Sequence, residues 1–167
     1  NILDKNDLVL QESGCVGSEN ERGNTYMKKI GIVTDSHSSI SQEEAKKLGI
    51  FVLPMPFYID GECYYESVTL SRELFFEKLT SGADISTSQP SPTAVMEIWD
   101  KALEEYEKIL YMPISSGLSS SYNTAMMLAQ EEKYEGRVLV VDDGQVAAPL
   151  HQMILDTLDM NEKGYEA

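Results

Sequence analysis

Two loops rich in hydroxyl side chains carry the clearest chemical potential of this sequence. Residues 85–92 read Ile-Ser-Thr-Ser-Gln-Pro-Ser-Pro, and residues 114–122 read Ile-Ser-Ser-Gly-Leu-Ser-Ser-Ser-Tyr. Neither loop contains Lys, Arg or His. We interpret each loop as the link between a short strand-like run and an amphipathic helix, which gathers hydroxyl and backbone N–H donors where the helix dipole favours an anion. This chemistry suits the binding of a small anionic head group better than catalysis.

The candidate ligands for such a head group are hydroxyl residues of these two loops: Thr87, Ser88, Ser116, Ser119 and Ser120. An ionised carboxylate accepts several hydrogen bonds, and a bond to a charged group contributes about 1.5–3 kcal/mol. The same hydroxyls are equally suited to capping the helices that follow. The residues alone leave both interpretations open.

A third polar cluster, Asp35-Ser36-His37, follows the first predicted strand. Its residue types suggest a catalytic triad, and a small hydrolase or phosphatase acting here is the enzymatic alternative. Triads, however, assemble from distant segments, and neighbouring residues seldom align for proton transfer. Ligands in open α/β sheets bind beyond the carboxyl ends of the strands, so Ser36 is retained as a candidate ligand-binding residue.

Composition excludes several classes of function. The 167 residues include 28 acidic and 13 basic side chains, for a net charge of −15, which disfavours nucleic acid and anionic membranes. Cys15 and Cys63 lie far apart without metal-ligand spacing, and neither common nucleotide-binding glycine motif occurs, so we expect no metal and no cofactor. Reduced cysteines, no secretory signal and no apolar run of about 20 residues predict a cytoplasmic protein.

Strand and helix signals alternate from residue 27 onward. Residues 1–26 are polar and are expected to be disordered or loosely docked outside a domain at 27–167. Predicted strands cover 29–34, 50–53, 109–112 and 138–141. Predicted helices begin near Ser41, at Thr69 or Ser71, and near Ser91, Ser119 and Gln145. Asp60-Gly61 signals a β-hairpin within residues 54–66. We predict an α/β fold, a mainly parallel sheet of about four strands with helices on both faces and a small β-hairpin.

Five of these stretches, in order, resemble the DegV family of bacterial fatty-acid-binding proteins, which includes the lipid-binding subunits of fatty acid kinase. They are Ile32-Val33-Thr34-Asp35-Ser36, residues 59–79, Thr87-Ser88-Gln89-Pro90-Ser91-Pro92, Ile114-Ser115-Ser116-Gly117-Leu118-Ser119 with Tyr122, and residues 141–146. The resemblance implies non-catalytic binding of a long-chain fatty acid. It also implies that Thr87 and Ser119 hold the carboxylate and that a kinase partner phosphorylates it. The sequence departs from the family at Ser120-Ser121, where Gly-Thr is usual, and at Asp143-Gly144, where Asp-Ser is common.

Length is the largest departure from the family. Its members are nearly twice as long, with a second domain that completes the lipid pocket, so the resemblance covers the N-terminal domain only. An alternative function is therefore a truncated interaction module without lipid affinity, which self-associates through the face left by the missing domain. Apolar residues that would suit an acyl chain are also ordinary core candidates: Phe57, Ile59, Met126, Met127 and Met153.

Overall fold

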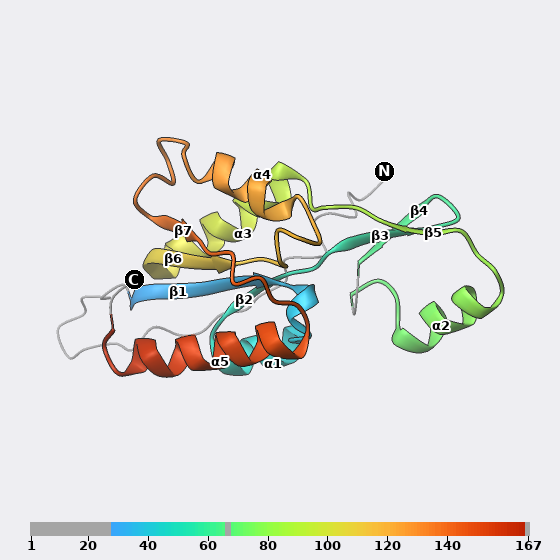
Figure 1. Ribbon diagram of the computed structural model, residues 1–167, viewed down its shortest axis with the longest axis horizontal. Coiled ribbons are helices and arrows are strands. Elements are labelled where there is room, and N and C mark those ends of the chain that lie inside the picture. The colour runs from blue at the N-terminus through green and yellow to red at the C-terminus, as the bar shows by residue number, and fades with distance from the viewer. Residues whose placement is uncertain (1–27, 66–67, 166–167) are drawn as a thin grey trace.

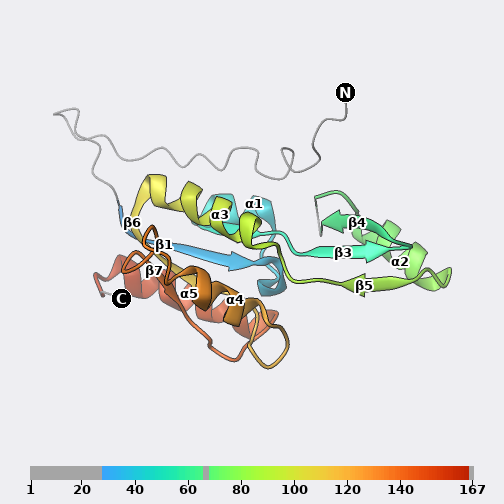
Figure 2. The ribbon, with the colours of Figure 1, turned by 90° about the horizontal axis from the view of Figure 1, so that it is seen from above.

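The computed structural model describes residues 28–65 and 68–165, which form a larger α/β body and a smaller lobe (Figure 1). The smaller lobe projects beyond the end to which β1 points, as the perpendicular view also shows (Figure 2). The predicted extension at residues 1–26 lies outside the described residues.

The body is built on a four-stranded parallel sheet in the order β2-β1-β6-β7. Its strands are β1 (Lys28–Asp35), β2 (Phe51–Leu53), β6 (Tyr106–Met112) and β7 (Val138–Val140). Helices α3 (Pro92–Glu105) and α4 (Ser121–Leu128) cover one face, and α1 (Gln42–Leu48) and α5 (Ala148–Glu162) cover the other (Figure 1). The predicted fold class is confirmed.

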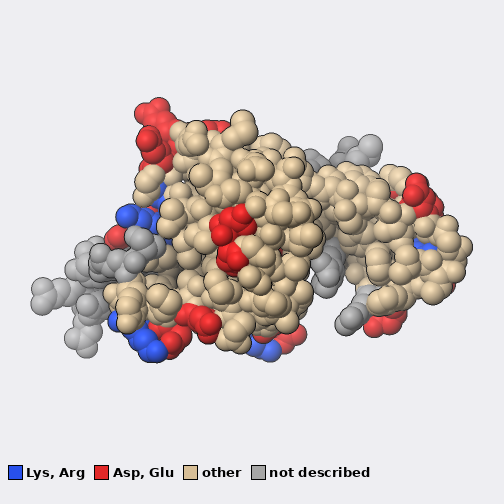
Figure 3. Space-filling model, in the orientation of Figure 1, with Lys and Arg blue, Asp and Glu red and all other residues tan. Residues whose placement is uncertain are grey.

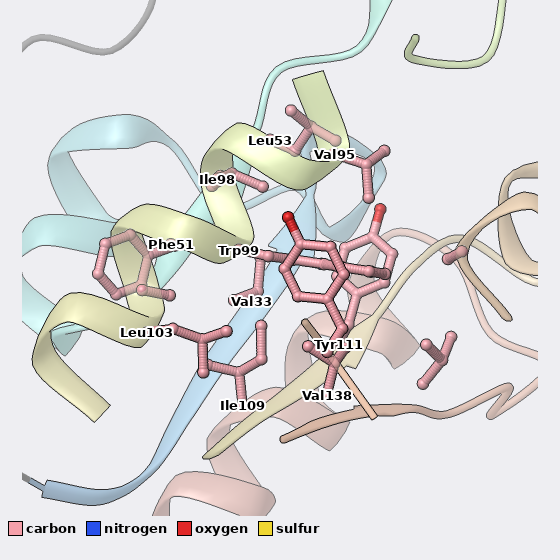
Figure 4. Packing of buried hydrophobic residues seen from close by; sticks show 14 of the residues in the cluster. Val33, Phe51, Leu53, Val95, Ile98, Trp99, Leu103, Ile109, Tyr111 and Val138 are labelled. Atoms are coloured by element: carbon pink, nitrogen blue, oxygen red, sulfur yellow. The ribbon is translucent and has the colours of Figure 1, made fainter. Parts of the chain in front are cut away.

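Alternation along the central strand divides the core into two clusters. Ile32 packs with α1 and α5, whereas the next residue, Val33, packs with α3, because successive side chains of a strand point to opposite faces. On the α3 side, the Trp99 ring meets Tyr111 edge-on at 5.4 Å between centroids and Tyr134 at 5.2 Å (Figure 4). Trp99 and Tyr111 are completely buried, so this cluster anchors α3 to the middle of the sheet.

Several local signals in the sequence act as predicted. The hydroxyls of Ser41, Ser71 and Ser91 each accept the N–H three residues ahead and cap α1, α2 (Arg72–Thr80) and α3. Gly49 ends α1 at a φ of 68°. A side chain at these caps thus fixes where each helix begins, and a glycine allows the left-handed exit.

The smaller lobe contains more sheet than the hairpin signal predicted. Strands β3 (Pro56–Ile59) and β4 (Glu62–Tyr65) form the expected hairpin, but β5 (Ile85–Thr87) pairs antiparallel with β3 and completes a three-stranded sheet. The first hydroxyl-rich loop therefore begins as a strand. The sequence does not predict this strand, because Ser86 and Thr87 break the apolar alternation that is typical of a half-buried strand. The strand pairs with β3 through backbone groups.

None of the helices in the described ranges is long and apolar enough to cross a membrane. Within the same ranges, no group of three or more His, Cys, Asp and Glu side chains is placed to hold a metal ion.

Candidate functional site

A half-open pocket of about 850 Å³ lies where the body and the smaller lobe meet. Its volume falls in the range of roughly 300–1,000 Å³ that is usual for small-molecule sites. The body contributes residues that follow β1 and β6, and the lobe contributes β3, α2 and β5. The pocket thus lies beyond the carboxyl ends of parallel strands, where open α/β sheets bind ligands.

Hydroxyl side chains from both predicted loops meet in this pocket. Thr87 and Ser88 reach it from the end of β5, and Ser119 and Ser120 reach it from the loop between β6 and α4. The two loops are separated by the whole of α3 in the sequence. The structure therefore brings together four of the six candidate ligand-binding residues.

Within the described residues, the Thr87 hydroxyl makes no hydrogen bond, and it is exposed on the pocket wall. The Ser88 hydroxyl donates to the carbonyl oxygen of its neighbour Gln89 at 2.9 Å. Thr87 can accordingly donate to a ligand without breaking a bond inside the protein, whereas Ser88 must exchange a local bond for a new one.

Ser119 was expected at the start of a helix, but α4 begins two residues later, with Ser120 at the N-cap. The Ser119 Oγ accepts the N–H of Ser121 at 3.2 Å and lies 2.7 Å from the Ser121 Oγ. Ser120 makes no side-chain capping bond to α4. The two serines therefore stand at the positive end of α4, where donors not used by a cap are available to an anion.

The other two candidate residues, Ser36 and Ser116, are not among the residues that line the pocket in the described ranges. The Ser36 hydroxyl accepts the Met55 N–H at 3.2 Å, which ties the turn after β1 to the segment between β2 and β3. Ser116 bonds Asp142 through its hydroxyl and through its N–H, the latter at 3.2 Å. These bonds from Ser116, followed by one from the Gly144 N–H, lower the pKa of the Asp142 carboxyl.

Asp35, the last residue of β1, is a buried support for the pocket. One oxygen, Oδ2, accepts the Ile114 N–H at 2.8 Å, and Oδ1 accepts the His37 N–H at 3.0 Å. His37 Nδ1 lies 3.2 Å from the same Oδ1. Asp35 thereby connects the serine loop after β6 to the short 3₁₀ helix η2 (Ser36–Ser38), and His37 lines the pocket beside that loop.

The geometry of Asp35-Ser36-His37 does not form the relay of a triad. Asp35 contacts His37, but the Ser36 hydroxyl is engaged by the backbone of Met55. A serine nucleophile needs its hydroxyl hydrogen-bonded to the base. No contact of Ser36 therefore favours the hydrolase or phosphatase alternative.

The rest of the pocket wall is mostly apolar, although Ser39, Ser71 and Gln89 also line it. Its apolar side chains are Met55, Pro56, Phe57, Leu70, Phe75, Phe76, Ile85, Ile114 and Leu118. Phe57 and Phe75 pack edge-on at 5.6 Å, and Phe76 meets Phe75 at 5.7 Å. Of the five apolar residues considered for an acyl chain, Phe57 lines the pocket. Ile59 is buried, and Met126, Met127 and Met153 are exposed elsewhere.

Sequence reasoning missed His37 as a pocket residue, along with Phe75, Phe76 and Leu118. The pair Phe75-Phe76 lies between Leu74 and Leu79, which gives α2 more apolar surface than one buried face needs. Leu118, 65% exposed, is the one apolar residue in a run of serines and glycine at 115–121. An apolar side chain that folding does not bury is the signal that could have marked them.

The pocket wall is almost free of charge. Among its lining residues in the described ranges, none is Lys, Arg, Asp or Glu, and His37 is the only titratable one. In Figure 3, red atoms form a patch near the middle of the body, and other red and blue atoms lie at its margins and on the smaller lobe, while the surface between body and lobe is mostly tan. An anion here would be held by hydrogen-bond donors instead of a fixed cation.

Comparison with known proteins places this arrangement in a family. The model of the DegV family, described as uncharacterised, matches residues 29–167. The chain belongs to the DegV family. A DegV domain-containing protein of Caldanaerobacter subterraneus is 31% identical over 138 residues, which are 83% of this chain and 49% of that protein. A 15.5 kDa DegV domain-containing protein of Staphylococcus aureus is 31% identical over 134 residues, which are 80% of this chain and 94% of that protein.

Solved DegV structures share the fold. A DegV family protein from Thermus thermophilus, described by its fatty acid binding, superposes with a TM-score of 0.75 at 32% identity. The match covers 83% of this chain and 49% of the Thermus protein. The chain thus spans about half the length of the Thermus and Caldanaerobacter DegV proteins, and nearly the whole length of the Staphylococcus relative.

Proposed function

We propose that this DegV family chain binds a long-chain fatty acid without altering it chemically, with the carboxylate on the hydroxyl wall and the acyl chain on the apolar wall. The single observation that carries this proposal is the composition of the pocket, which Thr87 and Ser119 line from two separate loops beside a wall of aliphatic and aromatic side chains. The fatty acid binding described for the Thermus relative supports it.

In this arrangement Thr87 and Ser119 donate to the carboxylate, and Ser88 and Ser120 assist. Ser36 and Ser116 act from behind the pocket by holding Met55 and Asp142. Each hydrogen bond to an ionised carboxylate contributes about 1.5–3 kcal/mol. The head group therefore fixes the orientation of the ligand more than it sets the overall affinity.

The acyl chain supplies most of the affinity. Each buried methylene contributes about 0.8 kcal/mol, so fourteen would contribute roughly 11 kcal/mol before the costs of association. The pocket is half open, and the exposed side chains Phe76 and Leu118, at 49% and 65%, stand on its wall. Contact with a bound acyl chain would cover these two side chains.

The bound carboxylate is presented to the catalytic subunit of a fatty acid kinase. The sequence contains neither of the common glycine motifs for nucleotide phosphates, so the phosphoryl chemistry falls to the partner. Lipid-loaded chain mixed with such a catalytic subunit and ATP should yield acyl phosphate, trapped as the hydroxamate. Loaded chain that yields none would contradict this part of the proposal.

Native mass spectrometry of the purified protein, followed by lipid extraction, tests the binding itself. We expect a stoichiometric fatty acid, or a stoichiometric mass shift on addition of oleate. Thr87→Ala should weaken oleate binding about tenfold, because one hydrogen bond to a charged group is lost. Ser86→Ala is the matched control, since Ser86 lies next to Thr87 on β5 but does not line the pocket. An empty protein that gives no mass shift with oleate would refute the proposal.

Self-association is the second candidate function, favoured by the exposed apolar side chains Phe76 and Leu118. Sedimentation analysis of the lipid-free protein tests it. A dimer that Leu118→Ser dissociates, in a protein that takes up no oleate, would establish the interaction module in place of the lipid carrier.

A further inference from the structure

Among the described residues of the pocket wall, His37 is the only titratable one, and contacts from two segments hold it in place. Asp35 Oδ1 accepts the His37 N–H at 3.0 Å and lies 3.2 Å from the ring Nδ1. The Ala147 N–H donates to the His37 carbonyl at 2.7 Å. Two segments far apart in the sequence therefore hold this residue in place.

One of these supports is held at a conformational cost. Ala147 has a φ of 55° and a ψ of −130°, a backbone region that favours glycine. Its N–H is the one that reaches His37, and the Gln145 carbonyl two residues earlier accepts the Ser115 N–H at 3.0 Å. The strained segment before α5 therefore braces both the histidine and the serine loop. Strain of this kind is retained where a fold must position a functional group.

Asp35 also sets the place of His37 relative to the hydroxyl wall. Its Oδ2 accepts the Ile114 N–H at 2.8 Å, and Ile114 begins the loop that carries Ser119 and Ser120. The imidazole and the serine hydroxyls thus follow neighbouring strands, β1 and β6, and are joined through one buried carboxylate. About a third of the His37 side chain remains exposed, on the wall of the pocket.

We propose that the His37 imidazole is a further head-group residue, which hydrogen-bonds the ligand carboxylate together with Thr87 and Ser119. This inference rests on the proposed function and specifies its ligand as an anion. The chemistry has a definite consequence. Asp35 and the ligand carboxylate both accept hydrogen bonds, so a ring that bridges them carries a proton on each nitrogen. The hydrogen bond from His37 to the ligand therefore requires the imidazolium form, and its formation takes up a proton when the ring starts neutral.

Other titratable groups on the neighbouring segments have contacts of their own. On the segment before α5, Asp142 accepts the N–H groups of Ser116 and Gly144. Asp143 Oδ1 accepts the Gln145 N–H at 2.9 Å, whereas the buried Asp143 Oδ2 has no hydrogen-bond partner among the described residues. On α5, which packs against η2, His151 pairs with Glu44 of α1 at 3.2 Å. On β6, the buried Tyr111 phenol lies near Asp35, and its pKa is raised chiefly by burial. Asp35 contacts the imidazole through Oδ1, 3.2 Å from Nδ1.

Displacement of the fluorescent fatty acid cis-parinaric acid by palmitate and by the uncharged hexadecanol, at pH 6 and pH 8, tests this inference. His37→Gln should weaken the binding of palmitate about tenfold at pH 6 and should change the affinity for hexadecanol by less than twofold. The ratio of wild-type to variant affinity for palmitate should be smaller at pH 8, because fewer His37 rings are protonated. Any effect of pH on palmitate itself is the same for both proteins and drops out of this ratio. His151→Gln, at the other histidine of the chain, should match the wild type.

Three results would overturn the inference. Palmitate affinity that His37→Gln leaves unchanged at pH 6 would remove His37 from the head-group site. An equal loss for palmitate and hexadecanol would mean that the ring only packs against the acyl chain. A wild-type protein that binds neither cis-parinaric acid nor palmitate would instead refute the proposed function, and this inference with it.

Discussion

Replacement of Asp35 by asparagine tests whether one buried carboxylate holds the pocket together. The Asp35 side chain is fully buried, and its two oxygens accept the N–H groups of Ile114 and His37. Asparagine has nearly the same shape but offers only one oxygen, so its NH₂ group must face one of these two backbone donors. One hydrogen bond to a charged group is lost, about 1.5–3 kcal/mol, and one buried N–H is left without an acceptor.

The opposing effect is the cost of burying a charge, several kcal/mol for an ion in a protein interior. A neutral asparagine escapes this cost, but it does not supply the second acceptor. Because the Ile114 N–H is buried and the His37 N–H is partly buried, we expect the lost bond to prevail, with a net destabilisation of about 3 kcal/mol and a fall in melting temperature of about 6–12 °C.

Urea unfolding followed by circular dichroism measures this difference. Asp142→Asn is the matched control, since Asp142 also accepts two backbone N–H groups but is exposed, so that water can replace part of the lost bonding and the loss of stability should be smaller. An Asp35→Asn variant as stable as the wild type, or more stable, would show that charge burial outweighs the hydrogen bonds. The account of Asp35 as a support of the pocket would then be wrong.

Two further predictions concern the body of the protein. Gly31→Ala should destabilise the fold by about 1–3 kcal/mol, because a Cβ at Gly31 would lie 2.7 Å from the Tyr106 ring, which a hydrogen bond to the Gly49 carbonyl holds in place. Thermal unfolding measures this, and an equal loss in Gly117→Ala, whose Cβ meets only ordinary contacts, would contradict the steric explanation. The pKa of Asp142 is lowered in the folded protein, so its carboxylate stabilises the fold at any pH above the ordinary pKa of an aspartate. This contribution disappears as the pH falls through the lower pKa that Asp142 has in the folded protein. A ¹³C NMR titration should therefore find the pKa of Asp142 below its ordinary value of 3.8, and Ser116→Ala should raise it.

The sequence predicted the body of the fold because its signals are local and redundant. The capping serines and Gly49 bound the helices, and β1 is apolar enough to be buried on both faces. The third strand of the smaller lobe escaped prediction because Ser86 and Thr87 pair with β3 through backbone groups that every residue has. The sequence of a short polar strand such as β5 does not indicate which distant strand it pairs with.

The residues of the site were foreseen unequally for a related reason. A cluster of Ser and Thr residues can be recognised in a sequence, and Thr87, Ser88, Ser119 and Ser120 do line one pocket. Residue type does not reveal direction, and the Ser36 and Ser116 hydroxyls turn toward Met55 and Asp142. His37 attracted attention for a triad, whereas its place on the wall depends on Asp35 and Ala147, contacts that only the folded chain creates.

The absence of a Lys or Arg from the pocket wall, within the described residues, bears on how the proposed carrier would release its ligand. A fixed cation would bind the carboxylate strongly and would compete with any partner that must reach the same oxygens. Hydroxyl donors each contribute less, and they leave lone pairs of the carboxylate free to act as a nucleophile toward a phosphoryl group. A histidine that carries charge only when protonated adds attraction that is lost when the proton leaves. Affinity supplied mainly by the acyl chain, with a weakly held head group, is therefore the arrangement that suits a protein whose ligand must react while still bound.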